Sequence, residues 1–269
     1  MPTETSARRP VAFIHGLWLH AESWHNWLEF FRAAGYETAA LSWPGDGATT
    51  AATRANPDKL AGYGVTEIAE HLAAQIRGYA AKPIVIGHSF GGMLAQNLLA
   101  GDLAAAAVAI DPAPIKGVAE LPGSVLKASF PVLGNPFNVR RAVTLTEAQF
   151  RFAFANAVSE AEAKALYAQY HMPAPGRPLF QAATATFNPN AATKVNTANA
   201  TRGPLLLMAG TADNTVPPVL VHSAYKRYQG SGAVTELIEI AGRGHSLTID
   251  SGWRAVAQTA LDWLRAKGL

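Results

Sequence analysis

The chain has no cysteine, and this absence removes three possibilities at once. Disulfides, thiolate metal sites and cysteine nucleophiles are all excluded, so any nucleophile must be another residue type. Charged residues are also scarce, at 15% of the 269 residues, whereas 49% are hydrophobic. A chain of this length and apolar content can bury a full core, within the size range of one domain that carries an insertion.

Long hydrophobic runs are absent as well. The longest, such as Pro83–Ile86 and Pro204–Ala209, are far shorter than the roughly 20 residues that a helix needs to cross a bilayer. The polar start of the chain is followed by Val11–Ile14, which is too short for the apolar centre of a signal peptide. The sequence therefore predicts no membrane insertion and a cytoplasmic location.

Clustered positive charge is a third feature that is missing, although the formal net charge is +3. Adjacent basic pairs occur at Arg8 and Arg9, Arg140 and Arg141, and Lys226 and Arg227. The other Lys and Arg residues are scattered, whereas nucleic-acid-binding domains gather them on one face. We interpret the basic residues as solvated surface charge and predict no nucleic-acid partner.

Short apolar runs rich in β-branched residues alternate with segments of helical periodicity. The strand candidates are Val11–Ile14, Thr38–Ser42, Pro83–Ile86, Ala105–Ile110, Pro204–Met208 and Glu236–Ile240. Nearly all lack the in–out alternation of a half-solvated strand. Continuous apolar runs of this kind are typical of parallel strands that are buried on both faces. The pattern predicts an α/β fold, with a mostly parallel sheet of about six strands flanked by helices.

Two apolar helical faces, in 65–76 and 253–264, are expected to pack on this sheet. The alternation breaks from 113 to 201, where Pro and Gly separate helical stretches. A structureless loop of that length is uncommon in a compact domain. We therefore predict a core formed by 1–112 and 202–269, with a helical cap inserted over 113–201.

One helix of the cap has a clear start signal. Thr146 is an N-cap candidate with Gln149 three residues on, the spacing of a capping box. The apolar stripe expected on this helix comprises Phe150, Ala153, Phe154, Ala157 and Val158.

The strongest local motif is the run 87–92, Gly-His-Ser-Phe-Gly-Gly. It follows a buried strand candidate and precedes the helical run Met93–Ala100, which is the context of a G-x-S-x-G nucleophile elbow. Such a turn lifts Ser89 above the sheet and points a helix N-terminus at it, which favours developing negative charge. The alternatives are a glycine-rich turn with an incidental serine, and a phosphate loop, whose G-x-x-x-x-G-K-[ST] pattern the chain lacks.

A serine hydroxyl needs a general base, and His245 is the best placed of the eight histidines. It lies in a glycine-rich loop after the last strand candidate, at the carboxyl edge of the sheet. An acid is expected between the serine and the histidine in chain order, and Asp213 meets that demand after Pro204–Met208. Asp111, at the end of the preceding strand, is the rival acid, and otherwise a helix or turn cap.

A tetrahedral intermediate also needs two N–H donors. One is the amide of Phe90, the residue after the nucleophile. For the other we predict the amide of Leu17, because Gly16 after the first strand allows close backbone approach. Trp18 and Phe154 are pocket candidates, although helical spacing makes most aromatic residues of the cap ordinary core residues.

The whole chain from residue 11 resembles the α/β-hydrolase superfamily, including its compact esterase and hydroxynitrile lyase members. The motifs that carry the resemblance are His15-Gly16, the Trp-Pro-Gly-Asp-Gly run 43–47, Gly87–Gly91, the Asp213 loop with Val216-Pro217, and Gly244-His245. Asp46 departs from the pattern, since many relatives carry histidine there; we interpret this as a changed loop side chain. The resemblance implies a Ser89–His245–Asp213 triad that needs no cofactor and no metal.

Hydrolysis of a small, fairly apolar carboxylic ester or lactone through an acyl-serine is the function we expect. Three alternatives stay open: hydroxynitrile lyase-like cleavage, cofactor-free perhydrolysis, and a non-catalytic ligand receptor of the same fold. Lyase relatives often have a cap lysine near the site, and Lys116 and Lys127 are candidates here. Relatives that form an alkyl-enzyme ester have aspartate at the position of Ser89, which disfavours an epoxide hydrolase or dehalogenase. The oligomeric state is not predicted.

Overall fold

A computed structural model describes residues 9–269, so the first eight residues of the predicted core lie outside it. Six strands form one sheet: β1 (Val11–Ile14), β2 (Thr38–Leu41), β3 (Ile84–His88), β4 (Ala106–Ile110), β7 (Leu205–Gly210) and β8 (Thr235–Ile240). They lie in the order β2-β1-β3-β4-β7-β8, and every neighbouring pair is parallel. The predicted strands and their parallel arrangement are confirmed.

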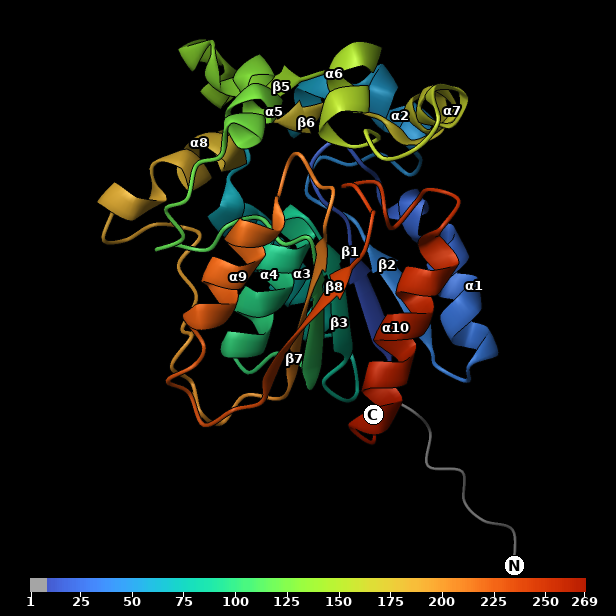
Figure 1. Cartoon of the computed structure of the whole chain (residues 1–269), viewed down its shortest axis with the longest axis vertical. Helices are drawn as coiled ribbons and strands as arrows, with labels where there is room; N and C mark the ends of the chain where they lie inside the picture. The colour runs from blue at the N-terminus through green and yellow to red at the C-terminus, as the bar shows by residue number, and fades with distance from the viewer. Residues whose placement is uncertain (1–8) are drawn as a thin grey trace, which may run out of the picture.

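Helices cover both faces of this sheet (Figure 1). They are α1 (His25–Ala33) and α10 (Trp253–Ala266) on one face, and α3 (Val65–Ile76), α4 (Phe90–Ala100) and α9 (Pro218–Lys226) on the other. Strand side chains alternate between two cores: Val11 and Phe13 pack toward α1 and α10, whereas Ala12 and Ile14 pack toward α3 and α4. Because both faces are covered, the inner strands need no polar residues, which explains the continuous apolar runs of β1, β4 and β7.

A layer of short elements lies above the carboxyl edge of the sheet (Figure 1). It contains α2 (Thr50–Ala55), α5 (Gly123–Leu133), β5 (Ala142–Val143), α6 (Glu147–Ala153), α7 (Glu160–Tyr170), β6 (Ala174–Pro175) and α8 (Arg177–Ala183). Short 3-10 helices complete the chain: η1 (Ala21–Trp24), η2 (Pro57–Leu60), η3 (Pro136–Arg140) and η4 (Ala185–Phe187). The cap boundaries at 113 and 201 stay a prediction.

The capping box at the start of α6 is present, with the Thr146 side chain accepting from the Gln149 amide. Two expectations in this region are wrong. The helix ends at Ala153, so Ala157 and Val158 lie beyond it and do not extend its apolar stripe. The pairing of β5 with β6 was also missed, because a strand of two residues is too short to leave a period in the sequence.

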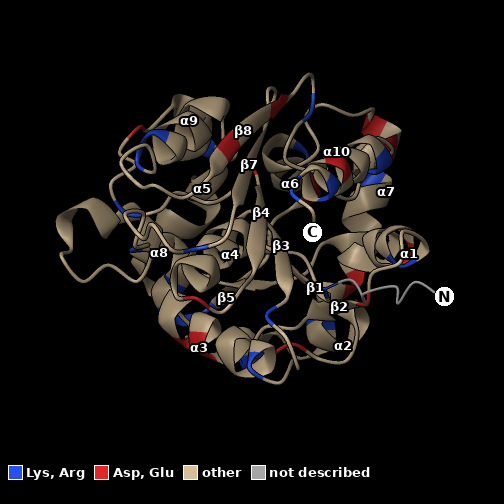
Figure 2. Ribbon diagram, turned by 90° about the horizontal axis from the view of Figure 1, so that it is seen from below, with Lys and Arg blue, Asp and Glu red and all other residues tan. Residues whose placement is uncertain are grey.

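Charged residues are interspersed over the helices rather than gathered on one of them (Figure 2). Among residues 9–269, no helix combines the length and the apolar character that crossing a membrane requires.

Candidate active site

Ser89 lies at the sharp turn between β3 and α4. Its φ of 56° and ψ of −123° are rare for a residue with a side chain, so the turn holds a strained backbone. A Cβ on Gly87 would lie 2.1 Å from the carbonyl oxygen of Gly91, and one on Gly91 would lie 2.2 Å from that of Ile14. Only glycine fits these two positions, which is the physical reason for the glycine spacing of the motif.

His245 and Asp213 meet on neighbouring loops, after β8 and β7 respectively. Nδ1 of His245 lies 2.5 Å from Oδ2 of Asp213, and both side chains are fully buried. The other oxygen of Asp213 accepts the amides of Thr215, at 2.6 Å, and Val216, at 2.9 Å. This arrangement fixes the proton of the imidazole on Nδ1 and leaves Nε2 as its basic nitrogen.

Nε2 of His245 is buried and makes no hydrogen bond within residues 9–269. The hydroxyl of Ser89 is therefore not bonded to it in this structure. In enzymes without substrate, hydrogen bonds of this kind are often long and tighten only when the substrate is bound.

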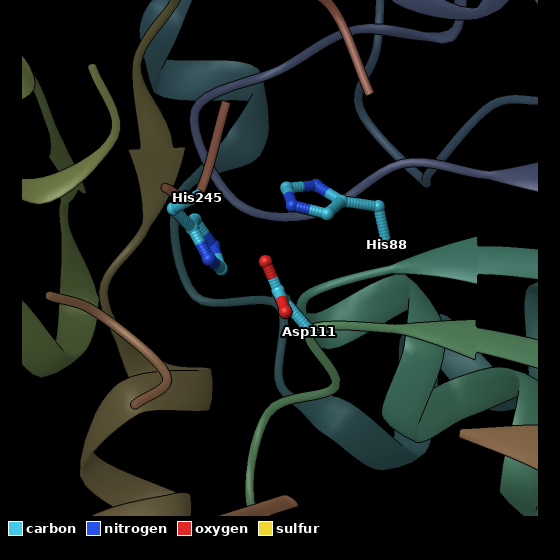
Figure 3. A group of neighbouring side chains, drawn as sticks. All are labelled: His88, Asp111 and His245. Atoms are coloured by element: carbon cyan, nitrogen blue, oxygen red, sulfur yellow. The ribbon is translucent and has the colours of Figure 1, made fainter. Parts of the chain in front are cut away.

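Asp111 and His88 complete a buried cluster with His245 (Figure 3). A ring nitrogen of each histidine and a carboxyl oxygen of Asp111 lie within 4.8 Å of one another, and the ring centroids of His88 and His245 are 4.5 Å apart. Burial lowers the pKa of His88 well below 6.5, and the neighbouring His245 lowers it further. Burial, and after it the charge of Asp213, raise the pKa of Asp111 well above 3.8. Of the two candidate acids, Asp213 is the one hydrogen-bonded to His245.

The loop after β1 packs directly against Ser89. A Cβ on Gly16 would lie 2.7 Å from Cβ of Ser89, so glycine is required for this approach. Trp18 follows in the left-handed region, with φ of 64°. Within the described chain, the amides of Leu17 and Phe90 donate no hydrogen bond to another protein group. Both predicted donors thus remain available to a ligand.

A buried contact between His15 and Asp46 anchors the same loop. Nε2 of His15 lies 3.1 Å from Oδ2 of Asp46, with both side chains only 1% exposed. Nδ1 of His15 lies 2.9 Å from the carbonyl oxygen of Gly16, and Asp46 also accepts the amide of Trp43. Asp46 is therefore more than a changed loop side chain, because it ties the loop after β2 to the loop beside Ser89.

Replacing Asp46 with alanine is expected to lower the free energy of unfolding by about 2 kcal/mol, because a buried hydrogen bond to a carboxylate is lost and His15 is left without this partner. The exposed pair of Glu29 and Arg32 provides the control. Glu29→Ala is expected to cost about 0.5 kcal/mol or less. Denaturant titration of both variants measures the two effects, and an equal cost would show that the buried pair does not anchor the loop.

A cavity of about 300 Å³ opens at Ser89. Its wall is mostly apolar and comes from α5, α8 and the loops around them, including Val118, Leu121, Val125, Leu133, Leu179 and Phe187. Leu121 and Phe187 are 62% and 88% exposed, so they form the rim of the cavity. Sequence reasoning missed these wall residues because scattered apolar residues of helices and loops leave no period that distinguishes a cavity wall from ordinary core.

Of the two predicted pocket residues, Trp18 and Phe154, only Trp18 lines the cavity. Trp18 lines the cavity, and its indole N–H donates to the carbonyl oxygen of Val143. Phe154 does not line it. Instead, its ring packs edge-to-face on His245, at 4.8 Å between centroids, and on Trp18, at 6.1 Å. Phe154 thus supports the histidine rather than forming the cavity wall.

A strained serine at a strand-to-helix turn, followed by an aspartate and a histidine on later loops of a parallel sheet, is the arrangement that defines α/β hydrolases. The chain belongs to the alpha/beta hydrolase family, whose profile matches residues 11–259. The resemblance and the fold predicted from the sequence motifs are confirmed.

Individual relatives either match only part of the chain or share little sequence identity with it. Protein ABHD8 of Homo sapiens is 38% identical over 80 residues, which are 29% of this chain and 17% of that protein. The match thus spans less than a fifth of the relative's length. The monoacylglycerol lipase of Paleococcus ferrophilus has a TM-score of 0.66 at 23% identity, covering 94% of this chain and 93% of that one. The methylesterase protein MES16 from Arabidopsis has a TM-score of 0.67 at 17% identity, covering 96% and 99%. At these identities the two structures share the fold.

Proposed function

We propose that the protein is a serine hydrolase that cleaves small, fairly apolar carboxylic esters or lactones. The observation that carries this proposal is the buried hydrogen bond between His245 and Asp213, at the same edge of the sheet as an elbow serine that lines an apolar cavity. The esterase and lipase among the structural neighbours support hydrolysis as the reaction class. A cytoplasmic location stays a prediction.

The first half of the reaction forms an acyl-serine. Oγ of Ser89 attacks the ester carbonyl carbon while Nε2 of His245 takes the hydroxyl proton. Asp213 holds the Nδ1–H tautomer and stabilises the imidazolium that forms, without taking the proton itself. The amides of Leu17 and Phe90 bind the oxyanion of the tetrahedral intermediate. As this intermediate collapses, His245 returns the proton to the leaving alkoxide.

The second half uses water in place of the alcohol. His245 removes a proton from the water molecule, whose oxygen attacks the acyl carbonyl carbon, and the proton then passes to Oγ of Ser89 as the ester bond breaks. The product acid leaves and the hydroxyl is restored. Every proton in this cycle moves through Nε2 of His245, and neither a metal nor an organic cofactor is needed.

The cavity lining favours an uncharged substrate. Glu120 is the only ionisable side chain among the described residues that line it. A carboxylate or ammonium bound there would lose hydration without gaining a partner of opposite charge along most of the wall. The substrate partner we propose is therefore a small, neutral ester.

The cap lysines do not favour lyase chemistry. Nζ of Lys116 donates to the carbonyl oxygen of Asn188, and Nζ of Lys127 lies 4.1 Å from the ring centroid of Phe152. Neither lysine belongs to the residues that line the cavity. The charge that lyase relatives place near the site is therefore not supplied by either candidate, and hydrolysis is the better-supported reaction.

Turnover of p-nitrophenyl esters from acetyl to dodecanoyl tests this proposal. Each methylene that the cavity buries is expected to raise kcat/KM by about fourfold, since burial contributes about 0.8 kcal/mol. The increase in kcat/KM should stop at the acyl length that fills the cavity. No turnover at any chain length would reject simple ester hydrolysis.

Ala128 of α5 lines the cavity, so Ala128→Phe is expected to move the best ester to a shorter acyl chain. Ala148→Phe is the matched control, because Ala148 is exposed on α6 and lies outside the cavity lining. The ratio of kcat/KM between short and long esters measures the shift. Equal ratios in the two variants would show that the acyl chain binds elsewhere.

A further inference from the structure

Three buried side chains at the carboxyl edge of the sheet carry polar atoms that the protein itself leaves without a partner. Both ring nitrogens of His88, Oδ2 of Asp111 and Nε2 of His245 make no hydrogen bond within residues 9–269. Each of the three residues is at most 1% exposed. Buried polar groups are nearly always paired, so a cluster of such atoms indicates a ligand.

The three side chains come together from different strands. His88 ends β3, Asp111 follows β4 and His245 lies in the loop after β8. In Figure 3 the carboxyl group of Asp111 points into the space between the two imidazole rings. A ring nitrogen of each histidine and a carboxyl oxygen of Asp111 lie within 4.8 Å of one another. This is the spacing of a site that can close around one small ion.

Two imidazoles and one carboxylate form a donor set that suits zinc. Sites with these three ligands and an open fourth position are typical of zinc, whereas Mg²⁺ and Ca²⁺ prefer oxygen ligands. Zinc needs its ligand atoms about 3.4 Å apart, so the side chains must shift by about 1 Å to bind it. The ring of His88 can move in this way without breaking a hydrogen bond.

The hydrogen bonds around the cluster leave the required atoms free and orient them. Oδ1 of Asp111 accepts the amide of Gly210, which leaves Oδ2 for a metal ion. Nδ1 of His245 bonds Oδ2 of Asp213, which leaves Nε2 as the basic nitrogen. A metal-bound histidine typically donates its other ring N–H to a carboxylate in this manner. Asp111 and Asp213 together also supply the two negative charges that a buried divalent ion needs.

We propose that His88, Asp111 and His245 bind one zinc ion, and that the bound ion inhibits the enzyme. The inhibition rests on the proposed function, in which every proton moves through Nε2 of His245. A metal ion on this nitrogen prevents it from accepting the proton of Ser89. Ser89 is the residue after His88 and lines the cavity, so the cavity is the expected route of entry.

Inhibition of p-nitrophenyl ester turnover by Zn²⁺ tests the proposed ligands. Zn²⁺ is expected to inhibit the wild type at concentrations where Mg²⁺ has no effect, because the site offers two nitrogens and a single carboxylate. His88→Phe and Asp111→Asn each remove a ligand and should raise the inhibition constant by about 100-fold or more, since loss of an outer-shell partner alone costs about 10–100-fold in metal affinity. Each variant is compared with its own activity in the absence of zinc.

His222→Ala is the matched control. His222 is an exposed histidine that contacts Glu239, so it represents the surface sites to which zinc binds without specificity. The inhibition constant of this variant should equal that of wild type. Equal constants in wild type, His88→Phe and Asp111→Asn would place the inhibitory ion elsewhere and overturn the proposal, and so would a wild type that zinc does not inhibit.

Isothermal titration calorimetry of Ser89→Ala measures zinc binding without turnover. This variant keeps the three ligands, so it should bind one Zn²⁺ at the cluster, and adding His88→Phe or Asp111→Asn should weaken that binding by about 100-fold or more. Circular dichroism checks that each variant folds, and Asp111→Asn decides the question if His88→Phe does not. If no ester is turned over, the proposed function fails, yet the calorimetry still decides whether these residues bind zinc.

Discussion

Ser89→Ala is expected to reduce kcat for the best p-nitrophenyl ester by roughly 10⁵-fold or more, because removal of a triad nucleophile has an effect of this size in other serine hydrolases. Alanine keeps the Cβ of the serine, so the packing of Gly16 against this position is preserved. The variant should therefore fold with the melting temperature of wild type. Steady-state assays with active-site titration measure the loss.

Ser23→Ala is the control for this experiment. Ser23 is also a buried serine, but it lies on η1 and does not line the cavity. It is expected to retain most of the wild-type activity. If Ser89→Ala retained activity comparable to that of Ser23→Ala, the ester would be attacked by another group, such as water activated by His245, and no acyl-serine would form.

The strands and the elbow could be predicted from sequence because their signals are local. Buried parallel strands are short apolar runs, and the elbow requires glycine on both sides of Ser89 at a fixed spacing. The backbone clashes at Gly87 and Gly91 give that spacing its physical basis. Chain order after the serine then singled out Asp213 and His245, the two residues that the structure joins by a hydrogen bond.

The surroundings of the site could not be predicted, because they arise from contacts between distant segments. The bond between Trp18 and Val143 joins residues 125 positions apart, and the buried pair of His15 and Asp46 joins residues 31 positions apart. No periodicity in the sequence indicates such partners. Phe154 shows the consequence, since its helical spacing could not distinguish a cavity wall from a support for His245.

Asp111 was considered as a rival to Asp213, and chain order alone did not exclude it. Both follow neighbouring strands at the carboxyl edge of the sheet, since β4 pairs with β7. Their difference lies in the donors that surround them: Asp213 accepts from His245 and two amides, whereas Asp111 accepts from one amide. Only the folded structure determines these donors, and they place Asp213 rather than Asp111 in hydrogen-bond contact with His245.

Asp213→Asn is therefore expected to lower kcat by about 10⁴-fold at pH 7, because an amide at this position holds the wrong tautomer of His245 and cannot stabilise the imidazolium. Asp111→Asn, assayed in parallel, should lose far less, since the hydrogen bond of His245 goes to Asp213 and asparagine can still accept the Gly210 amide. The two substitutions are chemically identical and lie at adjacent buried sites, so packing changes affect both alike. A larger loss from Asp111→Asn would move the role of the acid to Asp111, and equal losses would mean that the two carboxyl groups act as one unit.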